Sequence, residues 1–165
     1  MFTANQWMIT WRQRMSVNDE FYKLMLEMAE QAKVSGLELD MPPNSIKTHQ
    51  TEYTYFEPGK ILCAEFSFDE RFTNPLKVYQ GGFLCAAFDD VFGPLTYMAA
   101  KKPAVTLQMN TTFIRPFTAK DKKIMIKAEL ISQTKSLLVM QAEAKTMEGK
   151  LIAISNNQSF ILPAK

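Results

Sequence analysis

The chain contains few residues of the kinds that build metal sites and disulfide frameworks. Its two cysteines, Cys63 and Cys85, do not form a CxxC pair, and His49 is the single histidine among 165 residues. Zinc sites and disulfide scaffolds need several such side chains at short spacings. The sequence therefore predicts neither a metal site nor a disulfide framework.

Net charge and long apolar runs are also scarce. The formal net charge is only +2, with lysine and arginine scattered along the chain. Charge alone therefore predicts no nucleic-acid partner, although phosphate-bearing small molecules remain candidates. No stretch reaches the roughly 18 apolar residues of a membrane span, and the first residues lack the apolar segment of a signal peptide. We expect a cytoplasmic protein.

The chain does have enough apolar sequence to build one core. Hydrophobic residues make up 47% of the chain, which suits a single domain of this length. The capping-box spacing of Thr3 and Gln6 and an apolar stripe predict a short helix over residues 3–15. A second helix is predicted between Asn18, as its N-cap, and Gly36, because apolar residues recur there at three- and four-residue steps.

The pattern then changes to the alternation that is typical of strands. Residues 46–56 and 62–68, joined by the turn sequence EPGK, predict a β-hairpin. After the central glycine pair, apolar residues alternate in four more segments, which begin near Val105, Ile124, Leu138 and Ile152. Helices, a hairpin, one helix and then four strands predict an α+β fold with an antiparallel sheet.

The segment YQGGFLCAAFDD, residues 79–90, opens with two poor helix formers and closes on two carboxylates. Apolar residues from Phe83 to Leu95 would lie on almost every side of a helix, so we expect a helix without a water-facing stripe. A single sheet curled around the helix would bury it. Pro94 is expected to kink or end the helix.

These elements resemble a known family. A buried helix inside a curled antiparallel sheet is the hotdog fold, and the element order over about residues 46–162 is similar to that of the phenylacetate-degradation (PaaI-like) acyl-CoA thioesterases. That family's signature combines an Asn, a His-Gly-Gly triplet, an Asp and a later Ser or Thr in a strand. The corresponding positions here hold Asn74, Gln80, Gly81, Gly82, Asp89 and Thr106. Gln80 departs from the histidine of many members. The resemblance leaves residues 1–40 as an N-terminal helical extension and residues 41–165 as the hotdog domain.

The resemblance implies thioester hydrolysis, and helix geometry indicates how it would work. Free N–H groups of Gly81 and Gly82 at a helix N-terminus would stabilise negative charge on the thioester oxygen. Asp89 shares a helix face with Gly82 and is expected to act as nucleophile or general base, whereas Asp90 is rotated away and is expected to be structural. Roughly 10 Å of helix separates Gly82 from Asp89. We therefore expect each site to use two chains, in a homodimer or a dimer of dimers.

The roles of the remaining site residues are open at this point. Gln80 either donates its amide N–H to the thioester oxygen or caps the helix. Asn74 is expected to hold its loop or a water, and Thr106 either orients Asp89 or a water, or is an ordinary strand residue. Six cations are predicted to cluster around the helix exit, with Arg115, Lys120 and the Gly81 N–H as the residues for the coenzyme A phosphates. No further cofactor is expected, since coenzyme A is part of the substrate.

Two functions other than hydrolysis also occur on this fold. A non-catalytic acyl-CoA or lipid-binding hotdog protein is allowed by Gln80 but disfavoured by Asp89, because a pure binder gains little from an acid beside the thioester. Hotdog dehydratases rely on an active-site histidine. His49 is expected on an early strand, outside the motif.

Overall fold

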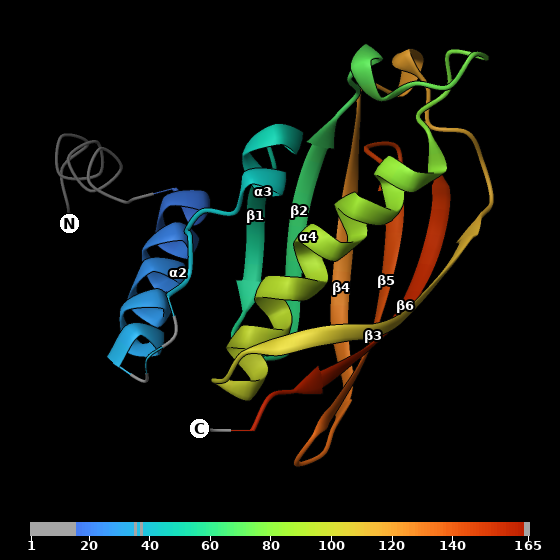
Figure 1. Ribbon diagram of the computed structural model, residues 1–165. Helices are drawn as coiled ribbons and strands as arrows, with labels where there is room; N and C mark the ends of the chain where they lie inside the picture. Colours follow the sequence, from blue (N-terminus) through green and yellow to red (C-terminus); the bar gives the residue numbers. More distant parts are fainter. Residues whose placement is uncertain (1–15, 35, 37, 164–165) are drawn as a thin grey trace, which may run out of the picture.

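Six antiparallel strands and one long helix form the body of the protein in a computed structural model, which describes residues 16–34, 36 and 38–163 (Figure 1). The helix predicted over residues 3–15 lies outside the described residues. The elements are, in chain order, α2 (Val17–Val34), α3 (Asn44–His49), β1 (Glu52–Glu57), β2 (Ile61–Ser67), η1 (Glu70–Phe72), α4 (Gly81–Ala100), β3 (Ala104–Phe113), η2 (Ala119–Asp121), β4 (Lys123–Gln133), β5 (Leu137–Thr146) and β6 (Leu151–Ile161).

The sheet has the strand order β1-β2-β4-β5-β6-β3, and every neighbouring pair is antiparallel. It curves behind α4, with β1 and β3 at its two edges (Figure 1). Apolar side chains of α4 and of the inner sheet face form one core cluster. The predicted α+β hotdog fold is therefore confirmed. No helix in the described part of the chain is long and apolar enough to cross a membrane.

Helix α2 begins at Val17, one residue before the expected N-cap, Asn18. Ser16 caps it instead, because its Oγ accepts a hydrogen bond from the Asp19 N–H while the Ser16 N–H donates to the Asp19 carboxylate. Asn18 has another role, since its Oδ1 accepts a hydrogen bond from the Tyr53 N–H on β1 at 2.8 Å. This bond and the buried Phe21 dock α2 onto β1.

The first strand of the hairpin is shorter than predicted. Residues 44–49 form α3, and β1 starts only at Glu52, so the expectation that His49 lies on a strand was wrong. The helical turn buries Ile46 and His49, three residues apart, on one side, a spacing that alternation cannot satisfy. The EPGK turn is confirmed, with the Lys60 N–H bonded to the Glu57 carbonyl.

Helix α4 continues through Pro94 to Ala100 instead of ending there. A proline removes the N–H that would bond the carbonyl four residues earlier, which here belongs to Asp90. The Tyr53 hydroxyl donates to that carbonyl at 2.9 Å. The buried carbonyl is thus satisfied from β1, and the helix can continue.

The wrapping of α4 is incomplete, contrary to the expectation of a helix with no water-facing stripe. Gly82, Asp89 and Gly93 are exposed and Ala86 is half-buried, at the spacing of one helix face. The sheet and α3 cover much of the rest of the helix. We call these four residues the open stripe of α4.

Candidate active site

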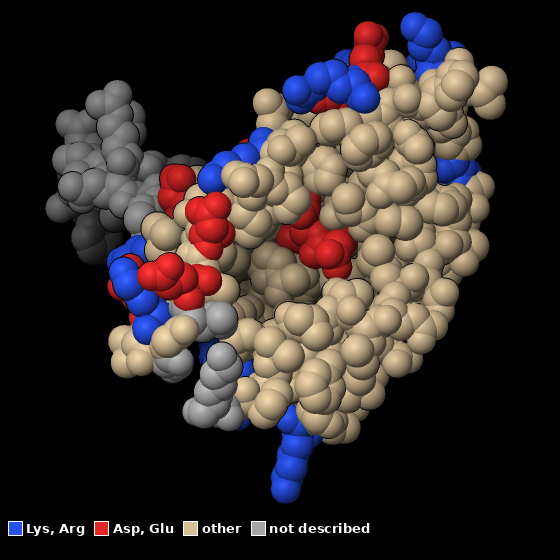
Figure 2. All heavy atoms as spheres, viewed as in Figure 1, with Lys and Arg blue, Asp and Glu red and all other residues tan. Residues whose placement is uncertain are grey.

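The open stripe of α4 lies on a hollowed face of the molecule. Figure 2 shows acidic side chains beside this hollow, on a face that is otherwise largely uncharged. Asp89 occupies the middle of the stripe, and Gly82 lies seven residues before it, near the start of the helix. The predicted face with both residues is therefore accessible.

The two glycines at the start of α4 differ in their surroundings. A Cβ at Gly81 would lie 3.0 Å from the Phe113 ring, so close packing explains the glycine at this position. A Cβ at Gly82 would meet nothing within 4 Å. Neither glycine N–H donates a hydrogen bond within the described residues. The Gly82 N–H is thus a free donor at a helix N-terminus, and the space beside the Gly82 Cα is open.

Asp89 is held by β3. The Thr106 hydroxyl donates to Asp89 Oδ1 at 3.1 Å. The protein around the carboxylate shields it from water and raises the pKa of Asp89 above its ordinary value; the Thr106 hydrogen bond lowers this pKa, and the charge of Asp90 raises it again. The structure therefore brings together two residues that the sequence placed in one site.

Asp90 lies in a different environment from its neighbour. Its Oδ2 is 2.6 Å from His49 Nδ1, and both side chains are almost completely buried. Asp90 therefore has a structural role in the core, as expected. It also keeps the single histidine away from the open stripe, which disfavours a dehydratase that would need His49.

Gln80 precedes α4, and its side chain forms no capping hydrogen bond. Its backbone carbonyl accepts from the N–H groups of Phe83 and Leu84, so the helix start is held by the main chain. The capping role considered for the Gln80 side chain is therefore wrong, and its amide is exposed at the helix start. Asn74 holds its loop, as expected, because its Oδ1 accepts from the N–H groups of Leu76 and Val78.

The predicted cluster of cations is divided between the two ends of α4. Lys101 and Lys102 follow its C-terminus, about 30 Å of helix away from its N-terminus. Arg115 and Lys120 lie instead on the segment after β3, which joins the helix start through the bond from the Tyr79 N–H to the Phe117 carbonyl. The Arg115 side chain donates to the Leu151 carbonyl at 2.9 Å. The side chains of Arg115 and Lys120 are both exposed. The prediction of one cluster was wrong, because chain proximity does not fix which end of a helix a segment reaches.

Other features of the site were missed by sequence reasoning. Ser159 on β6 is buried and pairs across the sheet with Thr106. Asn157 is also buried, and its side-chain N–H group has no hydrogen-bond partner among the described residues. The sequence did contain a signal for them, because the strand segment SNNQSF has polar residues at alternate positions where a core-facing strand normally has apolar ones. An apolar pocket of about 230 Å³ beside Asp89, between α4 and α2, carried no sequence signal because distant segments form it.

The described residues contain no group of three or more His, Cys, Asp or Glu side chains that could hold a metal ion. The expectation that neither a metal nor a cofactor takes part stays a prediction.

The chain is similar to known proteins in part of its sequence and in its fold. Residues 78–153 match the sequence model of the thioesterase superfamily. No curated protein matches the chain in sequence. The structure is similar to that of the PaaI protein from the phenylacetic acid degradation operon of Escherichia coli, with a TM-score of 0.70 and 15% identity over 91% of this chain and 99% of that one.

Two further solved structures are similar at low identity. A phenylacetic acid degradation-related protein from Ralstonia eutropha has a TM-score of 0.66 and 23% identity over 79% of this chain and 98% of that one. A thioesterase from Haemophilus influenzae has a TM-score of 0.65 and 21% identity over 73% of this chain and 83% of that one. At these identities the structures show a shared fold, and the superfamily match supports thioester hydrolysis as the general reaction. The resemblance to the PaaI-like hotdog thioesterases is thereby confirmed: residues 78–153 match the thioesterase superfamily, and the chain has the fold of PaaI.

Proposed function

We propose that this protein hydrolyses an acyl-CoA thioester to the free acid and coenzyme A. The observation that carries this proposal is Asp89, a partly exposed carboxylate on the open stripe of α4, hydrogen-bonded by Thr106 and set beside an apolar pocket. Its pKa is raised by shielding from water, and perturbed carboxylates in a concave site are typical of catalytic groups.

The chemistry needs an oxyanion donor and a nucleophile. The free Gly82 N–H, with the positive end of the helix dipole behind it, would stabilise the carbonyl oxygen as it gains negative charge. Asp89 would either activate a water or attack the carbonyl carbon directly. In the first route Asp89 takes a proton from water, the resulting hydroxide adds to the carbonyl carbon, the bond from carbon to sulfur breaks, and Asp89 returns the proton to the coenzyme A thiolate. In the second route the carboxylate displaces the thiolate and forms a mixed anhydride, and a water then hydrolyses the anhydride, which regenerates Asp89 and supplies the proton for the thiolate. Gln80, whose amide is free, would donate a second hydrogen bond to the same oxygen.

Two chains are needed to complete such a site. Gly82 and Asp89 of one helix are separated by about 10 Å along the axis, too far to act on one carbonyl. β3 supports a dimer, because it is an edge strand that presents the exposed apolar residues Val105, Leu107 and Phe113. Two copies packed about a two-fold axis would place Asp89 of one chain against Gly82 of the other. Whether two such dimers associate further stays a prediction.

Coenzyme A would be held at the helix start. Arg115 and Lys120 are exposed beside the N-terminus of α4, and the Gly81 N–H is free there. Arg115 uses one terminal nitrogen for the Leu151 carbonyl and retains other donors for phosphate. The cytoplasmic location stays part of this proposal.

The test is hydrolysis by Asp89→Asn and Asp90→Asn variants, followed as release of free thiol from a panel of acyl-CoAs. Asp89→Asn keeps size and hydrogen bonding but removes the charge, so the rate should fall about 100-fold or more. Asp90→Asn should lower the rate much less, because Asp90 faces His49 and not the open stripe.

Binding of a non-hydrolysable acyl-CoA analogue, measured by calorimetry, serves as the control. Asp89→Asn should bind the analogue within a few-fold of the parent protein. Equal hydrolysis rates for Asp89→Asn and the parent would refute the catalytic role. A parent that binds the analogue but releases no thiol would establish the non-catalytic acyl-CoA-binding function instead.

A further inference from the structure

Gly93 lies in the middle of α4 without a packing reason. A glycine inside a helix costs about 1 kcal/mol relative to alanine. Close contact with another element often explains such a glycine, as Phe113 does at Gly81, but a Cβ at Gly93 would meet nothing within 4 Å. Gly93 follows Asp89 by one helical turn on the open stripe. The missing side chain therefore leaves free space directly beside the carboxylate.

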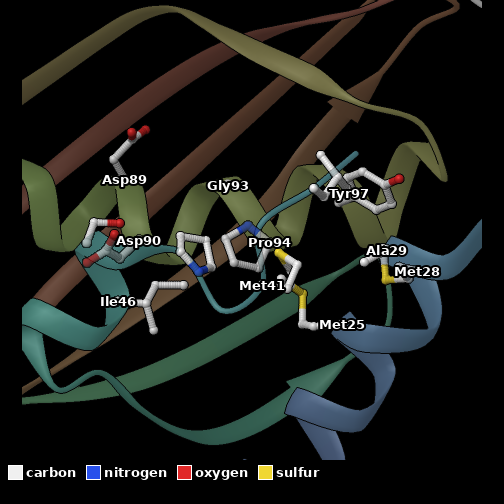
Figure 3. Close-up of a pocket in the computed structure, with 13 residues that line it drawn as sticks. Met25, Met28, Ala29, Met41, Ile46, Asp89, Asp90, Gly93, Pro94 and Tyr97 are labelled. Atoms are coloured by element: carbon white, nitrogen blue, oxygen red, sulfur yellow. The ribbon is translucent and has the colours of Figure 1, made fainter. Parts of the chain in front are cut away.

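That space is part of the apolar pocket between α4 and α2. Figure 3 shows Asp89, Gly93 and Tyr97 in order along α4, with Met25, Met28 and Ala29 of α2 at the far side. Apart from Asp89, Asp90 and Ser45, the lining is apolar or aromatic. A pocket with one acidic end and an otherwise apolar wall suits a ligand whose reactive polar group lies at one end of a hydrocarbon body.

The volume restricts the size of that body. The pocket measures about 230 Å³, whereas an apolar cavity of roughly 150 Å³ is known to hold benzene. An aromatic ring or a short aliphatic chain therefore fits within this pocket.

A second apolar pocket of about 250 Å³ adjoins the first. Both pockets are lined by Met25, Met41, Pro43 and Ile46, which form the wall between them. Methionine side chains are unbranched and adaptable. We therefore expect the position of this wall to depend on the size of the side chains at positions 25 and 41.

We propose that the pocket between α4 and α2 binds the acyl group of the thioester, that Gly93 keeps it open beside Asp89, and that the wall containing Met41 limits the length of the acyl group. This inference rests on the proposed function and extends it to a substrate class, aryl and short-chain acyl thioesters. It also assigns a role to the N-terminal extension, since α2 forms one side of the pocket.

Two variants change the pocket in opposite directions. Gly93→Leu places a side chain into the free space and should lower kcat/KM at least tenfold for phenylacetyl-CoA and hexanoyl-CoA, while acetyl-CoA hydrolysis stays within a few-fold. Met41→Ala removes part of the wall and should shift the preferred chain length upward, toward decanoyl-CoA. The parent should prefer phenylacetyl-CoA and hexanoyl-CoA over palmitoyl-CoA.

Matched controls make similar changes of side-chain size outside the pocket. Ala100→Leu adds a large side chain near the end of the same helix, and Met147→Ala truncates a methionine that is exposed on a turn. Both should keep the chain-length profile of the parent. Sedimentation of each variant reports whether a change in assembly, and not in pocket shape, alters the rates.

Calorimetric binding of S-hexyl- and S-ethyl-coenzyme A separates this inference from the proposed function. If the parent releases no thiol but binds S-hexyl-coenzyme A, and Gly93→Leu loses that binding selectively, the pocket assignment stands and hydrolysis does not. An unchanged chain-length profile in both pocket variants of an active enzyme overturns the pocket assignment alone. Equal loss on all substrates in Gly93→Leu, or loss of the parent's assembly state, also overturns it. A parent that neither hydrolyses nor binds these compounds refutes both.

Discussion

Asp89 and Asp90 are adjacent carboxylates with opposite surroundings. Asp89 faces the hollow and receives a hydrogen bond from the Thr106 hydroxyl. Asp90 points into the core, against His49. One residue of helix rotation, about 100°, is enough to separate a group available to a substrate from a group held by the fold.

Thr106 offers a test of how Asp89 is tuned. Its hydrogen bond lowers the pKa of Asp89, so Thr106→Val should raise that pKa. A nucleophile or general base works only when ionised, so the acidic limb of the pH profile of kcat/KM should move to higher pH, with the loss of rate greatest at low pH. Thr106→Ser should restore the parent profile. A uniform loss at every pH would indicate a structural role for Thr106 only.

The buried pair of His49 and Asp90 should contribute strongly to stability. Replacing His49 with Leu leaves the Asp90 carboxylate buried without its partner, which typically costs about 3 kcal/mol or more in the free energy of unfolding. Urea denaturation at a fixed protein concentration measures this loss. The double variant His49→Leu with Asp90→Leu should recover much of it, because no unpaired charge remains. A loss of only a few tenths of a kcal/mol in the single variant would contradict this account.

At the scale of elements, α4 depends on β1 to pass through a proline. The Asp90 carbonyl lacks the N–H that residue 94 would supply, and the Tyr53 hydroxyl takes its place. Helix α2 packs on the same strand, with the rings of Phe21 and Tyr53 centred 4.1 Å apart. Tyr53 therefore links three elements that are separate in sequence.

Tyr53→Phe should lower the free energy of unfolding by about 1–3 kcal/mol, since it leaves a buried carbonyl without a donor. Pro94→Ala returns the N–H to α4, so in that background Tyr53→Phe should cost markedly less. A double-mutant cycle from denaturation curves measures the difference. Equal costs in the two backgrounds would mean that the hydroxyl does not compensate for the proline.

At the scale of the whole molecule, the proposed site requires a second chain. The exposed apolar residues of β3 and the part of the open stripe from Gly82 to Asp89 provide a surface for it, whereas Gly93 borders the pocket. Such an arrangement predicts complementation between two inactive variants, because each mixed dimer would contain one intact site.

Gly82→Val blocks the oxyanion donor, and Asp89→Asn removes the carboxylate, so each variant alone should be nearly inactive. If the chains mix randomly, half of the dimers are mixed and each has one of two sites intact, which should restore about a quarter of the parent activity. Thiol release by the whole dimer population, after co-expression of the two variants in equal amounts and purification through a tag that both chains carry, measures this. Mixed dimers that stay inactive would refute a site shared between chains.

The fold was largely predictable from the sequence, whereas the site was predictable only in part. Alternating apolar residues marked the four strands after α4, and the glycine pair marked its start, because both signals act over a few residues. Family resemblance placed Thr106 in the site but left its role open, and the structure shows that its hydroxyl donates to Asp89. His49 was misplaced on a strand, because residues 46–56 have the composition of strands while burial of Ile46 and His49 favours a helical turn.

Local pattern was thus sufficient for the strand order along the chain, the central helix and the face that carries Gly82 and Asp89, since hydrophobic periodicity and helix phase are properties of neighbouring residues. Only the tertiary structure decided that α4 passes Pro94, that Asp90 pairs with His49, and that Gly93 opens into a pocket with Met25 and Met41. Each of these depends on contacts between segments that are distant in the chain, and the energy of such contacts is set by packing and not by the residues on either side.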